Sequence, residues 1–283
     1  MANIAFLGTG LLGSGMVEHF LRVGQSVTVW NRTPAKTHAL EVLGARAAAS
    51  PEEAVAGADR VHMALSDDAA VDEVMARFAP RLKKDAWVID HTTTSPAGTK
   101  ARYQRAARDG VSFVHAPVFM TPQMCRDAAG MMLVSGPKRQ FDAVRADLET
   151  MTGSVWYLGE RTDLAAGFKL FGNSMLFTVA GGIADVLAMA KTLDVSPQEA
   201  LGLFGKLQVG GMVAARAEKM SRGDFSATFE LTMARKDIGL MIDAAGPQPL
   251  AVLPGIAARM DDAIASGHGK DDLGAIAAEA IRR

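Results

Sequence analysis

Lys169 is the residue whose surroundings most clearly suggest proton chemistry. It stands in GFKLFGNSM, near the start of a long apolar run. Lysine is seldom buried without a reason, and burial lowers the pKa of an ammonium toward the range that is useful for acid–base work. We therefore treat Lys169 as a candidate general acid and base. The alternative is a lysine whose stem packs against apolar neighbours while its head reaches solvent.

Asn173 follows Lys169 by four residues, which on a helix places both side chains on one face. An ammonium and an amide side by side can hold a carbonyl or hydroxyl oxygen. A hydride-transfer site needs a group that exchanges a proton with the substrate oxygen. The pair is therefore a candidate for catalysis of this kind.

The hydroxyl-rich run DHTTTSP, residues 90–96, follows a predicted strand and precedes a predicted helix. Hydroxyl groups at the C-terminal edge of a parallel sheet are well placed for ligands, although the same residue types also cap helices. Both roles are open for different members of residues 92–95. His91 and His115 are weaker catalytic candidates, and Cys125 has no predicted base beside it. The histidines show no metal-ligand spacing such as HExxH, so we expect no metal site.

The glycine-rich run GTGLLG, residues 8–13, connects a short apolar strand to a helical pattern. In this setting one glycine makes a tight turn, one lets a pyrophosphate approach the backbone, and one lets the helix pack closely on the strand. The N–H groups and positive dipole end of the helix then hold the anion. The pattern predicts a dinucleotide site, and a purely structural turn is the alternative. The expected cofactor contacts here are Gly8, Gly10, Leu11, Leu12 and Gly13.

The end of the second predicted strand, WNRTPAK, indicates which cofactor is preferred. NAD sites usually have an acidic residue here for the ribose hydroxyls, whereas this chain has no carboxylate to repel a 2′-phosphate. The Arg32 guanidinium offers a planar set of donors for that phosphate, and Lys36 can assist it. We predict NADP(H) in preference to NAD(H), the alternative being that Arg32 is a solvated surface charge. The expected contacts in this part of the site are Asn31, Arg32, Thr33, Lys36, Leu65 and Ser66.

The composition indicates a folded protein of ordinary charge. Of the 283 residues, 49% are hydrophobic and 22% charged, so disorder is not expected. A net charge of −1 gives no basic excess that would favour nucleic acid or an anionic membrane. The single cysteine excludes an intrachain disulfide, which fits a cytoplasmic location. The N-terminus lacks the basic flank of a signal peptide.

The order of the predicted elements indicates an α/β domain followed by a helical domain. Residues 1–160 alternate β-rich runs with helices of about ten residues, which predicts βαβ units and a doubly wound parallel sheet of the Rossmann type. Residues 161–283 have apolar-periodic segments and no convincing strand. The expected strands are 3–7, 26–30, 60–65, 86–89, 111–115, 131–135 and 155–158.

One long helix, residues 164–193, is expected to join the two domains, with a length of roughly 45 Å at a rise of about 1.5 Å per residue. Its most apolar part, residues 168–190, contains Lys169, Asn173 and Asp185. We interpret this segment as a buried helix and not as a membrane span.

Together these elements resemble the β-hydroxyacid dehydrogenase family, which includes 3-hydroxyisobutyrate dehydrogenases and glyoxylate/succinic semialdehyde reductases. The resemblance covers nearly the whole chain. Residues 8–24 are similar to the family's cofactor signature, and residues 90–96 to its substrate-loop motif, with Thr93 at the threonine. Residues 167–173 resemble the motif that carries the catalytic lysine and its asparagine. The segment FELTMARKDIGLMIDAAG resembles a further family segment near the active site.

The resemblance implies a role for each matched residue. Lys169 would be the general acid and base in hydride transfer between NADP(H) and a small aldehyde, ketone or hydroxy acid, with Asn173 as its partner. Thr93 would bind substrate or the nicotinamide edge. Family members generally associate through the helical domain, so a homodimer or homotetramer is expected. The helical domain would also contribute Phe229 and Asp237 to the substrate site and Lys236 to the cofactor site.

One stretch departs from the family pattern. The family usually has Pro-Val-Ser-Gly, whose Ser-Gly binds the substrate carboxylate, but this chain has APVFMTPQM, with Phe119 and Met120 at those two positions. The change removes a hydroxyl and a flexible backbone point and adds apolar bulk. We therefore expect Phe119 and Met120 to line a site for a larger or more apolar carbonyl compound.

Two other functions stay open. Imine reductases resemble this fold and share the VWNRTPAK-type segment; they usually lack the catalytic lysine, which this chain retains. A protein that binds NADP(H) without useful catalysis, as a redox sensor or scaffold, is the alternative of another class. The retained Lys169 and Asn173 favour an enzyme. The expected partner is a small carbonyl compound, hydroxy acid or imine, with no nucleic acid and no membrane.

Overall fold

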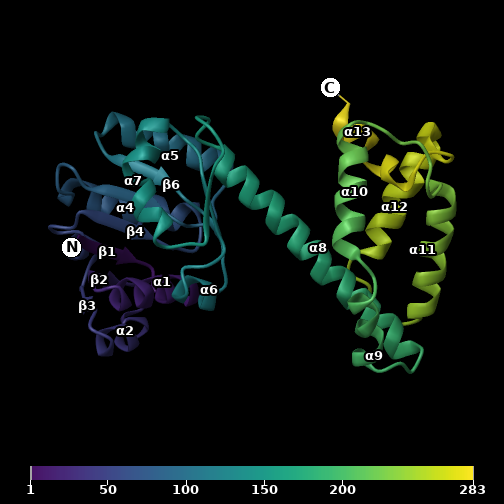
Figure 1. The fold of residues 1–283 in the computed structure, drawn as a ribbon, viewed down its shortest axis with the longest axis horizontal. Coiled ribbons are helices and arrows are strands. Elements are labelled where there is room, and N and C mark those ends of the chain that lie inside the picture. The colour runs from purple at the N-terminus through teal and green to yellow at the C-terminus, as the bar shows by residue number, and fades with distance from the viewer. Residues whose placement is uncertain (1, 283) are drawn as a thin grey trace. The chain divides into compact units, whose positions relative to one another are not determined.

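The structure is a computed structural model that describes residues 2–282. The chain forms two compact units, and the first ends at Asn173. The long helix α8 (Leu164–Thr192) therefore begins in the first unit and continues into the second (Figure 1).

The first unit contains a six-stranded parallel sheet in the order β3-β2-β1-β4-β5-β6. The strand order extends outward in both directions from β1 and β4, which is the doubly wound arrangement predicted from the sequence. The carboxyl ends of the strands all lie at one edge because the strands are parallel. The strands are β1 (Asn3–Leu7), β2 (Ser26–Trp30), β3 (Arg46–Ala47), β4 (Arg60–Met63), β5 (Trp87–Asp90) and β6 (Ser112–His115).

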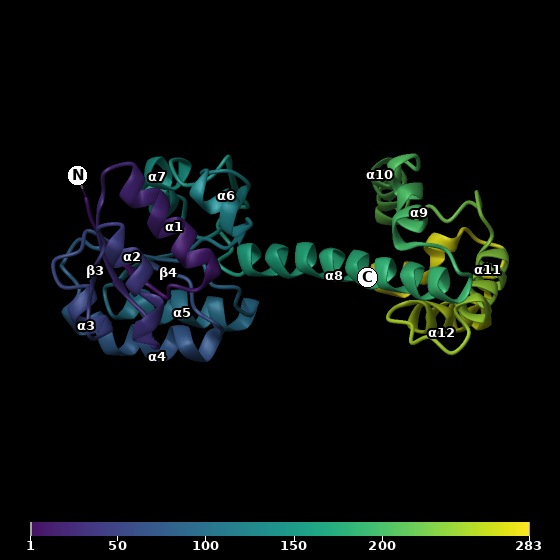
Figure 2. The ribbon, with the colours of Figure 1, turned by 90° about the horizontal axis from the view of Figure 1, so that it is seen from below.

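Helices cover both faces of this sheet (Figure 2). Successive strand residues point to opposite faces, so Ile4 and Phe6 belong to one apolar cluster and Ala5 and Leu7 to the other. The first cluster packs against α1 (Leu11–Arg22), α2 (His38–Val42), α6 (Pro122–Arg126) and α7 (Lys138–Glu149). The second packs against α3 (Pro51–Ala54), α4 (Asp68–Phe78) and α5 (Pro96–Arg108).

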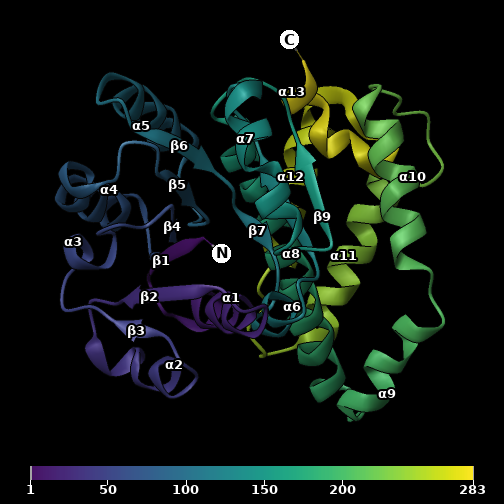
Figure 3. The ribbon, with the colours of Figure 1, turned by 60° about the vertical axis from the view of Figure 1, so that its left-hand side comes forward.

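Two strands expected in the main sheet belong instead to a second, three-stranded sheet in the order β7-β8-β9. Strand β8 (Met131–Val134) pairs in parallel with β9 (Ser154–Tyr157) and antiparallel with β7 (Val118–Phe119). Figure 3 shows α7 beside this sheet. The predicted parallel sheet comprises β1 to β6, and the strands predicted at 131–135 and 155–158 form this separate sheet, in which β7 runs antiparallel to β8.

The second unit is helical, as predicted, and its described residues contain no strand longer than a single bridge. Its core joins α11 (Leu231–Ala245) to α12 (Leu253–Ala263) through Leu231, Ile238 and Met260. The buried Asp185 of α8 accepts hydrogen bonds from the N–H groups of Ala251, Val252 and Leu253 at the start of α12. The other helices of this unit are α9 (Pro197–Gly202), α10 (Val209–Ser221), α13 (Ala278–Ile281) and the short turns Leu203–Gly205, Ile264–His268 and Leu273–Ala277. The first unit also has two short turns, Pro34–Lys36 and Ala79–Arg81.

Helix α8 is one continuous helix, as predicted, but the expectation that it is buried is wrong. Phe177 is 67% exposed and Leu176 60% exposed in the single chain. By length and composition alone, α8 is also the one helix within residues 2–282 that could cross a bilayer. An apolar pattern around a whole helix does not say what covers it, because a core and a contact between subunits require the same residue types.

Candidate active site

The turn after β1 contains three glycines with different surroundings. Gly8 has a φ of +98°, and a Cβ atom there would lie 2.3 Å from the Ala64 carbonyl oxygen. A Cβ atom at Gly13 would lie 2.0 Å from the Gly8 carbonyl oxygen, so only glycine lets α1 pack this closely. Gly10 instead faces open space, and no side chain caps the N-terminus of α1. This open cradle with free N–H groups fits a pyrophosphate.

A pocket of about 310 Å³ lies at the carboxyl ends of β1, β2 and β4. This is the point where the strand order reverses, at which doubly wound sheets bind nucleotides. The predicted residues Leu11, Leu12, Gly13 and Thr93 are not in its wall, and Lys236 belongs to the second unit. The predicted residues that the pocket brings together are Gly8, Gly10, Asn31, Arg32, Thr33, Lys36, Leu65 and Ser66.

Asn31 holds two loops of this pocket together. Its Oδ1 accepts from the Thr9 N–H at 3.1 Å, and its Nδ2 donates to the Thr33 carbonyl at 3.0 Å. A carboxylate can only accept hydrogen bonds, whereas an amide both accepts and donates. Asn31, which follows β2, therefore stabilises the two loops, and it also leaves this position without an acidic group.

The pocket is lined by three cationic side chains, Arg32, Lys36 and Arg77, and by one carboxylate, Glu73. Arg32 and Lys36 are both exposed there, and among residues 2–173 neither side chain forms an ion pair. The sequence reasoning missed Arg77, which also lines the pocket, 5.9 Å from the centre of the Trp30 ring, and is paired with Glu52 at 2.9 Å. The sequence shows that Arg77 lies in a helical pattern, but this pattern does not tell which face of α4 lines the pocket.

The run DHTTTSP divides into structural residues and one free hydroxyl. Thr92 Oγ1 accepts from the Leu65 N–H at 2.9 Å, and Thr94 Oγ1 lies 2.8 Å from the Thr99 hydroxyl in the interior. Ser95 caps α5 by accepting from the N–H of Gly98 at 3.0 Å. Thr93 is exposed, and its side chain makes no hydrogen bond within residues 2–173. Of the threonines in the run, Thr93 is the one left for a ligand.

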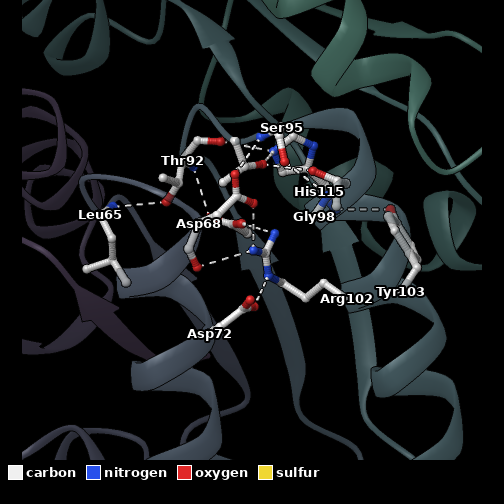
Figure 4. A network of polar contacts seen from close by, with 12 residues as sticks. Leu65, Asp68, Asp72, Thr92, Ser95, Gly98, Arg102, Tyr103 and His115 are labelled. Carbon is white, nitrogen blue, oxygen red and sulfur yellow. Dashed lines mark hydrogen bonds and ion pairs between the residues drawn. The ribbon is translucent and has the colours of Figure 1, made fainter.

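A buried arginine fixes the base of this loop (Figure 4). The side chain of Arg102, fully buried, donates to Asp72 at 2.8 Å and to Asp68 at 2.9 Å. Its third nitrogen lies 3.9 Å from the buried Asp90 carboxylate. Asp90 in turn accepts from the Thr92 N–H at 2.9 Å, and Asp68 accepts from the Ser95 N–H at 2.8 Å. The loop that presents Thr93 is therefore held at both ends.

Lys169 lies in the first turns of α8, where it is half-buried. Its Nζ is 4.1 Å from the centre of the Phe119 ring. Burial lowers the pKa of the Lys169 ammonium below its ordinary value. Asn173, also half-buried, follows one helical turn later, and within residues 2–173 neither side chain makes a hydrogen bond or ion pair. Both groups are therefore free to bind a ligand oxygen.

Of the predicted residues of the second unit, Phe229 lies two residues before the start of α11, and Lys236 and Asp237 lie within this helix. Phe229 donates its N–H to the buried Asp272 at 3.2 Å, while the residue as a whole is 38% exposed. Lys236 Nζ lies 2.9 Å from the Asp237 carboxylate, and both side chains are accessible to solvent. The two charges therefore neutralise each other locally.

The three weaker candidates, His91, His115 and Cys125, are buried. His91 and His115 lie in the interior, where burial lowers the pKa of His91 to about 4 and also lowers the pKa of His115. Burial raises the pKa of the Cys125 thiol to about 11, so it is not a reactive thiolate. Across residues 2–282, no three His, Cys, Asp or Glu side chains are grouped to hold a metal ion.

Residues 3–159 match the family described as the NAD binding domain of 6-phosphogluconate dehydrogenase. This match covers more than half of the 283-residue chain and coincides with the parallel sheet and its glycine turn. The chain belongs to this family.

Curated relatives include both enzymes and a nuclear factor. The chain is 28% identical over 257 residues to the cytokine-like nuclear factor N-PAC of Homo sapiens, covering 88% of this chain and 46% of that protein. The chain thus spans about half the length of the N-PAC relatives. It is 26% identical over 247 residues to glyoxylate/succinic semialdehyde reductase 2 of Arabidopsis thaliana, covering 86% and 69%. Identity to 2-(hydroxymethyl)glutarate dehydrogenase of Eubacterium barkeri is 23%, covering 97% and 93%.

Solved structures with the same fold include imine-reducing enzymes. The imine reductase from Myxococcus stipitatus in complex with NADP+ superposes with a TM-score of 0.90 at 21% identity, covering 98% of this chain and 99% of that chain. The reductive aminase from Aspergillus terreus in complex with NADPH and ethyl levulinate superposes with a TM-score of 0.89 at 24% identity, covering 100% of both. These likenesses establish the fold.

Proposed function

We propose that this protein catalyses NADP(H)-dependent hydride transfer between the nicotinamide and a small aldehyde, ketone or hydroxy acid. The observation that carries the proposal is Lys169, half-buried and without a carboxylate partner in its own unit. A lysine with a lowered pKa at a ligand site is suited to acid–base work.

The bound nicotinamide would supply or accept the hydride at the carbon of the substrate. In the reducing direction, Lys169 Nζ donates a proton to the carbonyl oxygen, and in the oxidising direction it removes the hydroxyl proton. Asn173 orients the ammonium and the substrate oxygen. The hydroxyl of Thr93 binds substrate or the edge of the nicotinamide. By the family resemblance, Phe229 and Asp237 contribute to the substrate site and Lys236 to the cofactor site.

The preference for NADP(H) over NAD(H) rests on Arg32 and Lys36. A guanidinium can bind a 2′-phosphate through two parallel hydrogen bonds, and Asn31 stands where a carboxylate would repel that phosphate. The exposed N–H groups at the start of α1 suit the pyrophosphate.

A second candidate is NADPH-dependent imine reduction. Phe119 and Met120 replace the polar residues expected for a substrate carboxylate, and this favours a more apolar substrate. The retained Lys169 favours carbonyl or alcohol chemistry. A third candidate, an NADP(H)-binding protein without catalysis, is favoured by the relationship to the nuclear factor N-PAC.

We further propose a homodimer or homotetramer in the cytoplasm, with no membrane or nucleic acid as partner. The exposed apolar side chains of α8, among them Leu176 and Phe177, suit a contact between subunits.

NADPH oxidation by the full chain tests the proposal against four substrates: glyoxylate, succinic semialdehyde, an uncharged aldehyde and a cyclic imine. Turnover of an aldehyde supports the dehydrogenase function, and turnover of the imine alone supports the second candidate. Tight NADPH binding without turnover of any of the four would support the third.

A further inference from the structure

Phe119 is held in place by the backbone on both sides. It ends β7, where it pairs with Met131 of β8. Gly130 has a φ of +86°, and a Cβ atom there would lie 2.7 Å from the Phe119 carbonyl oxygen. Two residues further on, Thr121 caps α6 by accepting from the Met124 N–H at 3.2 Å. The position of the ring is therefore set by the fold and not by a mobile loop.

The Phe119 ring packs directly on the backbone of α8. A Cβ atom at Gly172 would lie 2.2 Å from Phe119 Cζ, so any other residue at position 172 would overlap the ring. The motif around Lys169 thus contains a glycine whose empty side-chain position is filled by the aromatic ring of another element. The same ring receives the ammonium of Lys169, with Nζ 4.1 Å from the ring centre.

An aromatic face carries negative electrostatic potential, which attracts an ammonium. The same potential repels a carboxylate. The Phe119 side chain offers no hydrogen-bond donor, and the Met120 thioether beside it is only a weak acceptor. The proposed function assigns the Lys169 ammonium and the Asn173 amide to the reacting oxygen. A carboxylate beside Phe119 would therefore lose hydration without gaining a donor from Phe119 or Met120, which is unfavourable.

We propose that Phe119 is a specificity-determining residue. Its ring holds the Lys169 ammonium and favours aldehydes and ketones whose carbon chain carries no carboxylate. This inference rests on the proposed function, because it assigns a substrate class to the same site. The ring has a second effect on Lys169. Burial disfavours the ammonium, whereas the ring face stabilises it, so an aliphatic side chain of similar bulk in place of the ring should lower the pKa of Lys169 further.

The test uses a matched pair of substrates, succinic semialdehyde and its methyl ester, which differ in the charge at one end. For the wild-type protein with NADPH, we expect kcat/KM for the ester to exceed that for the acid at least tenfold. In Phe119→Ser, this ratio should fall at least tenfold. Phe171→Leu is the matched control, because Phe171 is an exposed aromatic residue of α8 and the ratio should stay that of the wild type.

A wild-type enzyme that uses acid and ester equally well would overturn the proposal, as would an unchanged ratio in Phe119→Ser. Circular dichroism identifies a variant that fails to fold, and Phe119→Leu, which keeps apolar bulk, then replaces it. The pKa of Lys169 is a second readout, which does not need turnover. NMR of the protein with isotopically labelled lysine measures this pKa, and the Lys169→Met variant identifies the signal of Lys169.

We expect this pKa to be lower in Phe119→Leu than in the wild type, and an unchanged pKa would contradict the seating of the ammonium. If no substrate is turned over, the proposed function fails, while the pKa comparison still decides whether the ring holds Lys169.

Discussion

The Nε atom of Arg102 lies 2.8 Å from the Asp72 carboxylate, and the arginine side chain is fully buried. Removal of one partner from a buried ion pair leaves an uncompensated charge. Asp90, which is also fully buried, would lose the cation 3.9 Å away. We therefore expect Arg102→Met to lower the free energy of unfolding by about 3–5 kcal/mol, measured by urea denaturation.

Arg105→Met is the matched control for this prediction. Arg105 pairs with the same Asp72 carboxylate, but its side chain is 42% exposed. An exposed ion pair contributes about 0–1 kcal/mol, so the loss should be small. Equal losses in the two variants would mean that burial of Arg102 does not decide its contribution.

Acid should destabilise the protein through its buried imidazoles, of which His62 and His91 contact each other. His91 Nδ1 lies 2.8 Å from the Ala116 carbonyl oxygen and must donate to it. His91 Nε2 therefore accepts from His62 Nδ1, 3.0 Å away, and both rings are neutral. Burial lowers the pKa of His91 to about 4 and that of His62 well below its ordinary value.

In the unfolded chain, both histidines titrate near pH ~6.5. Between that pH and the lowered native pKa values, the unfolded state binds more protons, so stability falls as pH falls. Each histidine should remove up to about 1.4 kcal/mol per pH unit in this window. Urea midpoints at pH 7.5, 6 and 5 should show a shallower decline in His91→Gln, whereas the exposed His38→Gln should match the wild type. An identical decline in His91→Gln would contradict this account.

Arg32 should distinguish the two nicotinamide cofactors. Removal of a charged hydrogen-bond donor typically changes binding by about 1.5–3 kcal/mol, so Arg32→Ala should weaken NADPH binding about tenfold or more. NADH binding should change little, because NADH lacks the 2′-phosphate. Fluorescence titration measures both affinities, with the exposed Arg46→Ala as control. Parallel losses for both cofactors, or no loss for NADPH, would make Arg32 an ordinary surface charge.

Association should depend on the exposed apolar part of α8. Sedimentation equilibrium is expected to give two or four times the mass of one chain. Phe177→Glu should shift the distribution toward the monomer, because Phe177 is 67% exposed in the single chain and a charge in an apolar contact is unfavourable. Lys191→Glu tests a charge change elsewhere on the same helix and should have little effect. A wild-type protein that sediments as a monomer would contradict the proposal.

Local signals predicted much of the fold. The bounds of β1 and β2 agree with the predicted strands 3–7 and 26–30. Helices α4 and α5 each begin after a capping residue, Asp67 and Ser95. The glycine turn was also visible, because the spacing of Gly8 and Gly13 reflects close contacts that no side chain could occupy.

The rest depends on partners that are distant in the sequence. Strands β3 and β7 have only two residues each, too few for an alternating pattern. The contact between Phe119 and Lys169 joins β7 to α8, and the residue types alone did not indicate that the ring would sit on the ammonium. The sequence also did not indicate that Arg102 is buried, because nothing in α5 shows that three carboxylates from other elements lie around its side chain.

The central claim is that Lys169 transfers the proton. The most direct measurement is kcat for NADPH oxidation by Lys169→Met, with the best substrate of the panel, together with the NADPH dissociation constant. General acid catalysis contributes about 10²–10⁴-fold, so kcat should fall at least a hundredfold while NADPH affinity stays within about twofold. Lys191→Met, an exposed lysine of the same helix, should behave as the wild type. Full turnover by Lys169→Met would contradict the account.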